Sequence, residues 1–466
     1  MSDSSTSKPT SRRADRDADR NCRHAGALVW PRVTRVTGRP ATRTRAARAT
    51  LTGILGVAVV LLGVVLAGCD PTTSEGDVQR PTSEATPETG PVTAAVPAGE
   101  PGVSDDRILF GQSAAFRGPA QELGLNMRLG ILAAFHEANQ QGGVHGRQID
   151  LTWLDDSYEP EAAATNTLEL INEQNVFALI GAVGTPTSRS ATPVAKAAGV
   201  PYIGPFTGAE FLRDAATLDN VINMRASYYQ ETEEMVNRLT TDLGVTRIAV
   251  LYQDDSYGLA GFNGVRLALE RRSMEMAALG IYTRNTTAVK RALLDLRQGN
   301  PEAVIIIGAY QPVAAMIAWG RQTGFDPIFM TVSFVGSNAL AEELGAGGAG
   351  VFVTQVVPFP TDDSLPVVRA YHRALADYDP DAIPGFVSFE GYLAGRLAVA
   401  GLERCGRNVS RACLFESFRS SEPYDIEGFP LSYGAGDNQG ADRVFLTVLG
   451  PDANYHPAET LRDVPR

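Results

Sequence analysis

The stretch GAVGTPTS, from Gly181 to Ser188, contains the residues of this sequence best suited to hold an anion. It follows the apolar run VFALIGAV and opens a helical segment, so its backbone N–H groups and hydroxyls face a helix N-terminus. The glycine spacing is neither GxGxxG nor GxxxxGK, which argues against a dinucleotide or a nucleoside triphosphate. We therefore predict a cradle for a carboxylate at Thr185 and Thr187, although these residues could also form only a tight turn and a helix cap.

Small, hydroxylic and aromatic residues also follow the other predicted strands. Ligands of open α/β sheets bind beyond the carboxyl ends of the strands, and such side chains suit a small polar molecule. We expect the ligand to be bound by residues of these loops: Thr185, Thr187, Phe206, Thr207, Gly208, Tyr257, Tyr310, Ser333 and Phe334.

Residues that could catalyse a reaction or bind a metal are sparse. The histidines after residue 68 stand singly, without the paired spacing of a metal site: His136, His145, His372 and His456. No GxSxG motif is present. Three pairs of adjacent acids occur, a pattern more typical of turns and caps than of an acid/base couple: Asp155-Asp156, Asp254-Asp255 and Asp362-Asp363. We therefore predict that the protein is no enzyme and uses no cofactor or metal.

The elements that must position these loops alternate between short apolar strands and helical patterns. One series runs from ILFGQSAA (108–115) to VPYIGPF (200–206), and a second from RIAVLYQDD (247–255) to IFMTVSF (328–334). Strands separated by helices indicate a parallel, doubly wound sheet. Two series over about 360 residues predict an α/β fold class with two doubly wound Rossmann-like lobes.

An uncharged apolar run, Leu51–Ala67, precedes this region and follows several arginines. This order is typical of an export signal. The run leads through Gly68 directly into Cys69, which resembles the lipobox of bacterial lipoproteins, where the cysteine is lipidated and begins the mature chain. The alternative is an uncleaved membrane-spanning anchor, since about 20 apolar residues cross a bilayer. Both interpretations hold the remainder outside the cytoplasmic membrane.

The segments on either side of the export signal (51–68) have no apolar periodicity. Residues 1–50 are rich in Arg, Ser, Thr and Ala and form either a basic disordered tail or the product of a start codon assigned too early. Residues 69–103 are dense in Pro, Thr, Ser and Glu and cannot bury enough apolar surface to fold. We predict that they form a flexible tether.

The charge of the exported part is strongly negative. The whole chain has a net charge of −12, but residues 1–68 contain 12 basic and only 4 acidic residues, which leaves a net charge near −20 for the rest. Such a surface repels phosphate backbones, and no basic stripe interleaved with aromatics is present, so we exclude nucleic acid as a partner.

The only cysteines after Cys69 are Cys405 and Cys413, in ERCGRNVSRAC. An oxidising compartment and the short polar spacing make a local disulfide plausible. Two free buried thiols are the alternative. A metal site is not expected because no histidine lies near.

The chain resembles the type I periplasmic solute-binding proteins of the branched-chain amino acid importer family over nearly all of residues 104–450. The resemblance rests on the order of several stretches: GPAQELGLNMRLGILAAFHEANQQGGVHGRQIDL, DDSYEPEAAATNTLELI, IGAVGTPTS, GVPYIGPFTGAEFLR, RIAVLYQDDSYGLAG and IIGAYQPVAAMIAWGRQTGF. It implies two lobes joined by a three-segment hinge that closes on a ligand.

The family pattern also implies how the chain divides. The first lobe would comprise 104–224 and 356–425, and the second 225–355 and 426–466, the latter with a C-terminal tail. The three crossings would fall near Asn223–Tyr228, Gln355–Pro358 and Asp425–Pro430. The implied function is a monomeric, lipid-anchored receptor that delivers a small solute to the membrane permease of an ABC importer. A ligand sensor that signals to a membrane partner is the alternative.

Carried over by resemblance, Thr185 meets the carboxylate of the ligand, supported by Thr207 or Gly208. Tyr257 and Tyr310 are the aromatics of the second lobe, although Tyr257 could simply pack under its neighbouring glycine.

The sequence departs from the family pattern at two positions. Ser333 stands where amino-acid binders place an acid that pairs with the ligand's ammonium, and Leu123 replaces an aromatic residue. A buried ammonium needs a paired charge or strong acceptors. Asp156 or Asp255 could supply one, or the ligand is a simple carboxylate, an amide or an aromatic acid.

Overall fold

The computed structural model describes residues 99–420 and 422–464. The segments expected to form the basic tail, the export signal and the lipid anchor at Cys69 lie outside the described residues, as does most of the expected tether. None of the helices within the described ranges is long and apolar enough to cross a bilayer.

Five parallel strands form the first sheet, in the order β2-β1-β3-β4-β5. They are β1 (Arg107–Ala114), β2 (Gln148–Asp155), β3 (Ala178–Ile180), β4 (Tyr202–Ile203) and β5 (Val221–Ile222). The strand order reverses at β1, so the loops after β1 and β3 diverge and leave a crevice at the carboxyl ends of the strands. The cradle predicted at 181–188 follows β3 and therefore borders this crevice.

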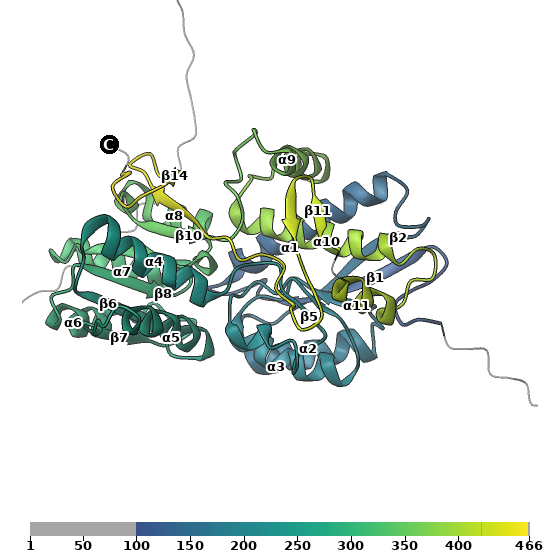
Figure 1. Ribbon diagram of the computed structural model, residues 1–466, viewed down its shortest axis with the longest axis horizontal. Helices are drawn as coiled ribbons and strands as arrows, with labels where there is room; N and C mark the ends of the chain where they lie inside the picture. Colours follow the sequence, from purple (N-terminus) through teal and green to yellow (C-terminus); the bar gives the residue numbers. More distant parts are fainter. Residues whose placement is uncertain (1–98, 421, 465–466) are drawn as a thin grey trace, which may run out of the picture. The chain divides into compact units, whose positions relative to one another are not determined.

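Helices flank the five-stranded sheet, and together they form the first lobe (Figure 1). They are α1 (Gln121–Gln140), α2 (Pro160–Asn172), α3 (Thr185–Ala197), η1 (Glu210–Arg213), α9 (Pro366–Tyr378), α10 (Phe386–Arg404) and α11 (Arg411–Arg419). The helix α1 packs against α9 and α10, and α2 against α3. The approach of α1 to α10 requires glycine, because a Cβ atom on Gly130 would lie 1.8 Å from the carbonyl oxygen of Ser388.

Seven strands form the second sheet, in the order β14-β13-β10-β9-β8-β6-β7. They are β6 (Ile248–Gln253), β7 (Leu279–Tyr282), β8 (Ala303–Ile307), β9 (Ile328–Thr331), β10 (Phe352–Gln355), β13 (Phe445–Leu449) and β14 (Tyr455–Ala458). The strands from β6 to β10 are parallel, whereas β13 and β14 add an antiparallel edge.

The helices of the second lobe alternate with its strands in sequence, beginning with α4 before β6: α4 (Tyr228–Leu243), α5 (Ser256–Glu270), α6 (Lys290–Gln298), α7 (Tyr310–Gln322), η2 (Ser333–Val335), α8 (Ser337–Leu344) and η3 (Gly345–Gly348). α4 begins with a capping box, in which the Ser227 hydroxyl and the Gln230 side chain each accept a backbone N–H. The predicted α/β class with two doubly wound sheets is confirmed, with the antiparallel edge as an addition that the sequence did not predict.

The chain passes between the lobes three times. It leaves the first sheet after β5 and enters α4, returns after β10 toward α9, and crosses again after residue 431 to reach β13. The first and third crossings run side by side, because Asn223 donates its N–H to the Asn438 carbonyl oxygen at 2.8 Å and accepts from the Gly440 N–H at 2.8 Å.

The segment Asp425–Pro430, expected as the third crossing, belongs instead to a hairpin. β11 (Tyr424–Ile426) pairs with β12 (Phe429–Leu431), and β11 contacts α10 of the first lobe. The turn residues Glu427 and Gly428 both have positive φ, 51° and 87°, as a two-residue turn matched to the strand twist requires. The third crossing therefore lies between residues 432 and 444.

Cys405 and Cys413 are joined by a disulfide, with 5.7 Å between their Cα atoms. The bond links the end of α10 to the first turn of α11, where Ser410 caps the helix by accepting the Cys413 N–H.

Candidate functional site

The cradle after β3 meets the loop after β4. The two loops continue the parallel pairing of their strands, since Val183 forms a bridge with Phe206. As a result the hydroxyls of Thr185 and Thr207 lie 2.6 Å apart and both side chains are fully buried. Thr185 is the first residue of α3, whose early N–H groups have no partner within the helix. The arrangement presents two hydroxyls at a helix N-terminus.

Two other residues expected at this site serve the local fold. Thr187 donates its hydroxyl to the carbonyl oxygens of Gly184, at 3.0 Å, and of Val183, so the hydroxyl is engaged within its own turn. Gly208 lies against Tyr228, because a Cβ atom added to Gly208 would fall 2.7 Å from Cδ1 of that ring.

Phe334 stands at the centre of an aromatic cluster that spans the two lobes. Its ring centroid lies 4.5 Å from that of Tyr257, 5.3 Å from that of Phe206 and 6.0 Å from that of Tyr158. Tyr228 extends the cluster, 5.5 Å from Tyr257. Tyr257 donates its hydroxyl to the Gly308 carbonyl oxygen at 3.3 Å, in the loop that precedes Tyr310.

Tyr158 reaches this cluster from a strained turn. Ser157 and Tyr158 both have left-handed backbones, with φ of 48° and 63°, a conformation that side chains other than glycine adopt at a cost. Asp155 and Asp156 hold the turn, accepting the N–H groups of Ser157 and Tyr158. The ring of Tyr158 packs on Gly184, directly before Thr185 in the cradle.

A buried ion cluster lies beside the aromatic rings and consists of Arg225, Glu231 and Glu390. Arg225 Nη2 is 3.3 Å from Glu231 Oε1, and Nη1 is 3.4 Å from Glu390 Oε1. Arg225 belongs to the first crossing, Glu231 to α4 and Glu390 to α10. The guanidinium also stacks over the Phe206 ring at 5.0 Å.

Ser333 binds the carboxylate of this cluster. Its N–H donates to Glu231 Oε2 at 2.8 Å and its hydroxyl donates to Oε1 at 3.0 Å, while the hydroxyl oxygen accepts from Arg225 Nη2. Thr354 of β10 donates its hydroxyl to Glu231 Oε2 at 2.7 Å. Position 333 itself carries no acid, but the carboxylate of Glu231, from α4, lies directly beside it.

Burial and charge act differently on the members of the cluster. Burial raises the pKa of Glu390 to about 7, an effect that Arg225 only partly opposes. Burial also disfavours the charged form of Arg225, but Glu390 and Glu231 outweigh it and raise the pKa of the guanidinium. The cluster therefore holds a permanent cation, with Glu390 able to exchange a proton near neutral pH.

The acids considered as partners for an ammonium already accept hydrogen bonds from neighbouring residues. Asp156 accepts from the Ser113 hydroxyl at 2.8 Å and from the Tyr158 N–H at 2.9 Å. Asp255 is the N-cap of α5 and accepts from Tyr257 and Gly258. Asp156 therefore stabilises a turn and Asp255 caps a helix, which are the usual roles of adjacent acids.

The lobes also touch at further places, of which two concern residues named above or near them. Arg284 Nη2 of the second lobe lies 2.7 Å from Glu159 Oε2 of the first, and Asn285 donates to Oε1 of the same carboxylate at 2.8 Å. Elsewhere Leu123 packs on Gly336, whose Cβ would lie 2.5 Å from Leu123 Cδ2 and 3.6 Å from Cδ1 of Tyr310.

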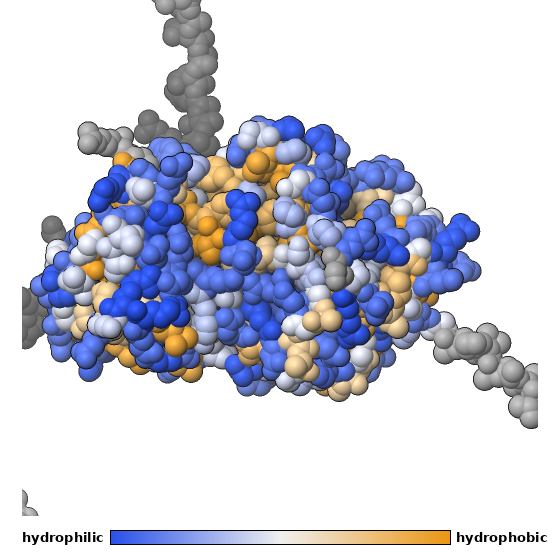
Figure 2. All heavy atoms as spheres, viewed as in Figure 1, coloured by the Kyte–Doolittle hydropathy of each residue, from blue (hydrophilic) through white to orange (hydrophobic). Residues whose placement is uncertain are grey.

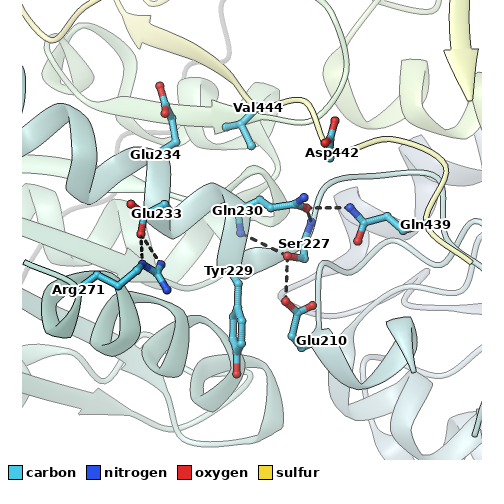
Figure 3. A pocket seen from close by; sticks show the side chains of 10 residues that line it. All are labelled: Glu210, Ser227, Tyr229, Gln230, Glu233, Glu234, Arg271, Gln439, Asp442 and Val444. Carbon is cyan, nitrogen blue, oxygen red and sulfur yellow. Dashed lines mark hydrogen bonds and ion pairs between the residues drawn. The ribbon is translucent and has the colours of Figure 1, made fainter. Parts of the chain in front are cut away.

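Two open grooves flank this buried centre. One, of about 530 Å³, lies on the outer face of the crossings and is mainly acidic (Figure 3); its lining includes Glu210, Glu233, Glu234, Arg271, Gln439 and Asp442. There Gln439 donates to the Gln230 side chain at 2.8 Å, which ties the third crossing to α4.

The other groove, of about 920 Å³, lies between α1 and α8 and is more apolar, with Leu129, Phe359, Ile383 and Phe386 in its lining. In Figure 2 apolar residues gather in the region between α8 and α9, on a face that is otherwise mostly hydrophilic. Neither groove contains the residues around Phe334.

Sequence reasoning missed Tyr158, Arg225, Glu231 and Glu390. Tyr158 could have been found, because DDSY at 155–158 repeats the DDSY at 254–257 that contains Tyr257. Glu231 carried no signal, because it lies in the polar stretch QETEE, whereas Arg225 and Glu390 each stand among apolar residues, in INMRA and FVSFEGYLAG. Within residues 99–420 and 422–464, no three His, Cys, Asp or Glu side chains gather as metal ligands would.

The chain is similar to a family of binding proteins and to several solved structures. Residues 108–454 match the family model described as periplasmic binding protein. The Leu/Ile/Val-binding protein homolog 7 of Brucella abortus (strain 2308) is 28% identical over 244 residues, which cover 50% of this chain and 60% of that protein. The chain thus spans less than two thirds of the length of this relative.

A second relative is the leucine-, isoleucine-, valine-, threonine-, and alanine-binding protein of Pseudomonas aeruginosa, 23% identical over 69% of this chain and 87% of its own length. Among solved structures, a possible leucine/isoleucine/valine-binding protein from Rhodopirellula baltica SH 1 is 39% identical with a TM-score of 0.73. The match covers 77% of this chain and 98% of that one.

Proposed function

The chain belongs to the periplasmic binding protein family, and from this premise we propose that it is an extracytoplasmic, lipid-anchored receptor of an ABC importer. It binds a small amino-acid-like or carboxylate solute between its two lobes and passes it to the membrane permease. The family and the structural neighbours are solute-binding proteins rather than enzymes, in agreement with the predicted absence of catalysis.

The observation that carries this proposal is the meeting of residues from both lobes around Phe334. Thr185, Thr207 and Phe206 come from loops of the first lobe, whereas Tyr257 and Phe334 follow strands of the second. A solute held among them touches both lobes at once. Only contacts that exist in the closed form can drive closure, because a ligand that binds the open and closed forms equally well does not shift the equilibrium between them.

The hydroxyl pair at the start of α3 is the proposed carboxylate site. One hydroxyl of the Thr185–Thr207 pair donates to the other, which leaves one O–H to donate to a ligand, and the positive end of the helix dipole favours an anion there. Phe206, Tyr257 and Phe334 supply the apolar walls. We place Tyr310, Gly208 and Ser333 at the margins of the site, and Thr187 in support of the turn.

Opening and closing would bend the three crossings. Asn223 and Asn438 tie the first crossing to the third, so these two segments would move as one strip. The anchor at Cys69 and the following tether would keep the receptor near its permease while leaving the lobes free to reorient.

Ligand-dependent thermal unfolding tests the proposal. The full chain, stripped of bound ligand by unfolding and refolding, is heated with a panel of amino acids, organic acids and amides. A solute at 100 times its Kd should stabilise the protein by about 2.7 kcal/mol. Replacing both hydroxyls, Thr185→Val with Thr207→Val, should abolish the shift, whereas Thr192→Val on the same helix should not. No shift with any member of the panel would contradict the proposal.

A further inference from the structure

The carboxylate of Glu231 has no acceptor capacity left for a ligand. A carboxylate offers about four lone-pair sites. Glu231 Oε1 accepts from Arg225 Nη2 and the Ser333 hydroxyl, and Oε2 accepts from the Ser333 N–H and the Thr354 hydroxyl. Ser333, Thr354 and Glu231 all belong to the second lobe, so the bonds among these three residues do not depend on how the lobes are placed.

Arg225, in contrast, has donors to spare. Its side chain is 1% exposed, and among the described residues neither Nε nor Nη1 has a hydrogen-bond partner. Glu390 lies 3.4 Å from Nη1, close enough for charge attraction but without hydrogen-bond geometry. The unpaired donors of a buried guanidinium have lost their hydrogen bonds to water, which costs free energy. A ligand acceptor that bonds to them would offset this cost.

The walls around Arg225 are aromatic. The guanidinium lies 5.0 Å above the Phe206 ring and 6.0 Å from the Tyr228 ring, and Phe206 in turn contacts Phe334. The nearest carboxylates are Glu231, which is saturated, and Glu390, whose pKa burial raises to about 7. An ammonium placed here would face a cation and find no free anionic acceptor.

We propose that the solute is a small organic acid with an apolar or aromatic chain and no ammonium group, and that Arg225 selects it by donating to its oxygen atoms. This inference rests on the proposed solute-binding function and narrows it. One acceptor group of the acid meets the hydroxyls of Thr185 and Thr207, and another takes the free donors of Arg225. A 2-oxo acid fits this description, because it presents an acceptor where an amino acid presents a donor.

A purely structural role for Arg225 would leave ligand choice unchanged. The residue lies in the first crossing and could do no more than tie α4 to α10. The ratio of two dissociation constants, for ligands that differ only at the α-carbon, separates the two roles, because a structural defect weakens both ligands alike.

The experiment therefore uses matched pairs with the full chain, freed of bound ligand and titrated calorimetrically. The pairs are leucine against 4-methyl-2-oxopentanoate and phenylalanine against phenylpyruvate. We expect the oxo acid of at least one pair to bind ten times more tightly, or better, than its amino acid. Equal or tighter binding of the amino acid in both pairs would overturn the inference.

Substitution of Arg225 provides the second measurement. Arg225→Lys keeps the charge that Glu231 needs and removes Nε and the fork of donors. We expect the oxo acid of the pair to bind the variant at least tenfold more weakly than it binds the original protein. The affinity for the matching amino acid should change much less, so that the ratio of the two dissociation constants falls toward one. An unchanged ratio would overturn the inference, and thermal unfolding without ligand checks that the variant is folded.

Failure of the inference is distinguishable from failure of the proposed function. If amino acids or amides bind while every oxo acid fails, the receptor function stands and the assigned ligand class is wrong. If no member of the panel binds, the proposed function itself fails and the inference with it.

Discussion

Ser333 donates both its backbone N–H, at 2.8 Å, and its hydroxyl, at 3.0 Å, to the carboxylate of Glu231. The loop after β9 therefore contributes hydrogen-bond donors to the centre of the protein instead of an acid, and the acid comes from α4. Because the acid comes from α4, its carboxylate accepts the hydrogen bonds of Ser333 and is not free to bind a ligand. Glu231 is saturated, and among the described residues the unpaired donors around it include Nε and Nη1 of Arg225 and the hydroxyl of Tyr228.

Thr354→Val tests the strength of the bonds to Glu231. The substitution removes a buried hydroxyl that donates to a charged acceptor at 2.7 Å, and such bonds contribute about 1.5–3 kcal/mol. We expect the free energy of unfolding, from urea titration at pH 7, to fall by that amount. The control Thr192→Val removes an equally buried hydroxyl that donates to the Ser188 carbonyl oxygen of its own helix. Equal losses in the two variants would show that the charge of Glu231 adds nothing.

Arg284→Met tests the contact between the lobes at Glu159. The pair is partly exposed, so it should contribute no more than about 1 kcal/mol to the closed form. We expect ligand affinity to fall two- to fivefold, with the difference shrinking at high salt. Arg291→Met removes an exposed arginine that, within residues 99–420 and 422–464, pairs only with Asp295 on the same helix, and it should leave affinity unchanged. A loss of the same size in both variants would exclude a specific latch.

The raised pKa of Glu390 predicts how the stability of the protein depends on pH. Its pKa is about 7 in the folded protein and ordinarily 4.5, so the folded state retains a proton that the unfolded chain has lost. The free energy of unfolding should therefore fall as pH rises from about 5 to about 8, by at most about 3 kcal/mol from this group. Arg225, Arg213 and Glu231 are the charges that face it.

The variant Glu390→Gln stays neutral and should flatten this slope. Asp156, whose pKa burial also raises to about 7, contributes in the same direction, so some slope should remain. Glu302→Gln is the control, because hydrogen bonds from the Thr246 and Arg247 backbones lower the pKa of Glu302 and place its titration below the window. A slope that Glu390→Gln leaves intact would contradict the assignment.

The disulfide should stabilise the fold without affecting the ligand. Closing a loop with a sequence separation of 8 restricts the unfolded chain by about 2–3 kcal/mol. Replacing both Cys405 and Cys413 by Ser should lower the free energy of unfolding by that amount. Ligand affinity should not change, because Cys405 follows the last turn of α10 and Glu390 lies in its first turns, about 22 Å along the axis. An affinity loss would indicate that α11 helps to shape the site.

The proximity of neighbouring loops in the candidate site was predictable, because the carboxyl ends of parallel strands share one edge of a sheet. Thr185 and Thr207 are 22 positions apart in the sequence, yet their hydroxyls meet because their strands are neighbours. Periodicity and turn residues carry this information locally. Phe206 follows a strand of the first sheet, whereas Tyr257 and Phe334 follow strands of the second, so their meeting depends on how the two lobes face each other.

The ion cluster was not predictable in the same way. Arg225, Glu231 and Glu390 come from a crossing and two helices, and only tertiary packing decides that these charges are buried. Charged residues are almost never fully buried unless paired, so Glu231, in a polar stretch, reads as a surface position. Arg225 and Glu390 stand among apolar residues, but their partners come from distant parts of the sequence. The displaced third crossing has a local cause, because the alternation of Tyr424, Ile426, Phe429 and Leu431 around Glu427-Gly428 indicates a hairpin.

Hydrogen exchange of the full chain, with and without the organic acid that binds it most tightly, tests the central claim most directly. The account predicts slower amide exchange on ligand binding in loops of both lobes, at 181–188, 205–208, 255–258 and 331–336, because the solute touches both and holds them closed. Protection confined to one lobe, or to the acidic groove lined by Glu233 and Gln439, would contradict binding between the lobes.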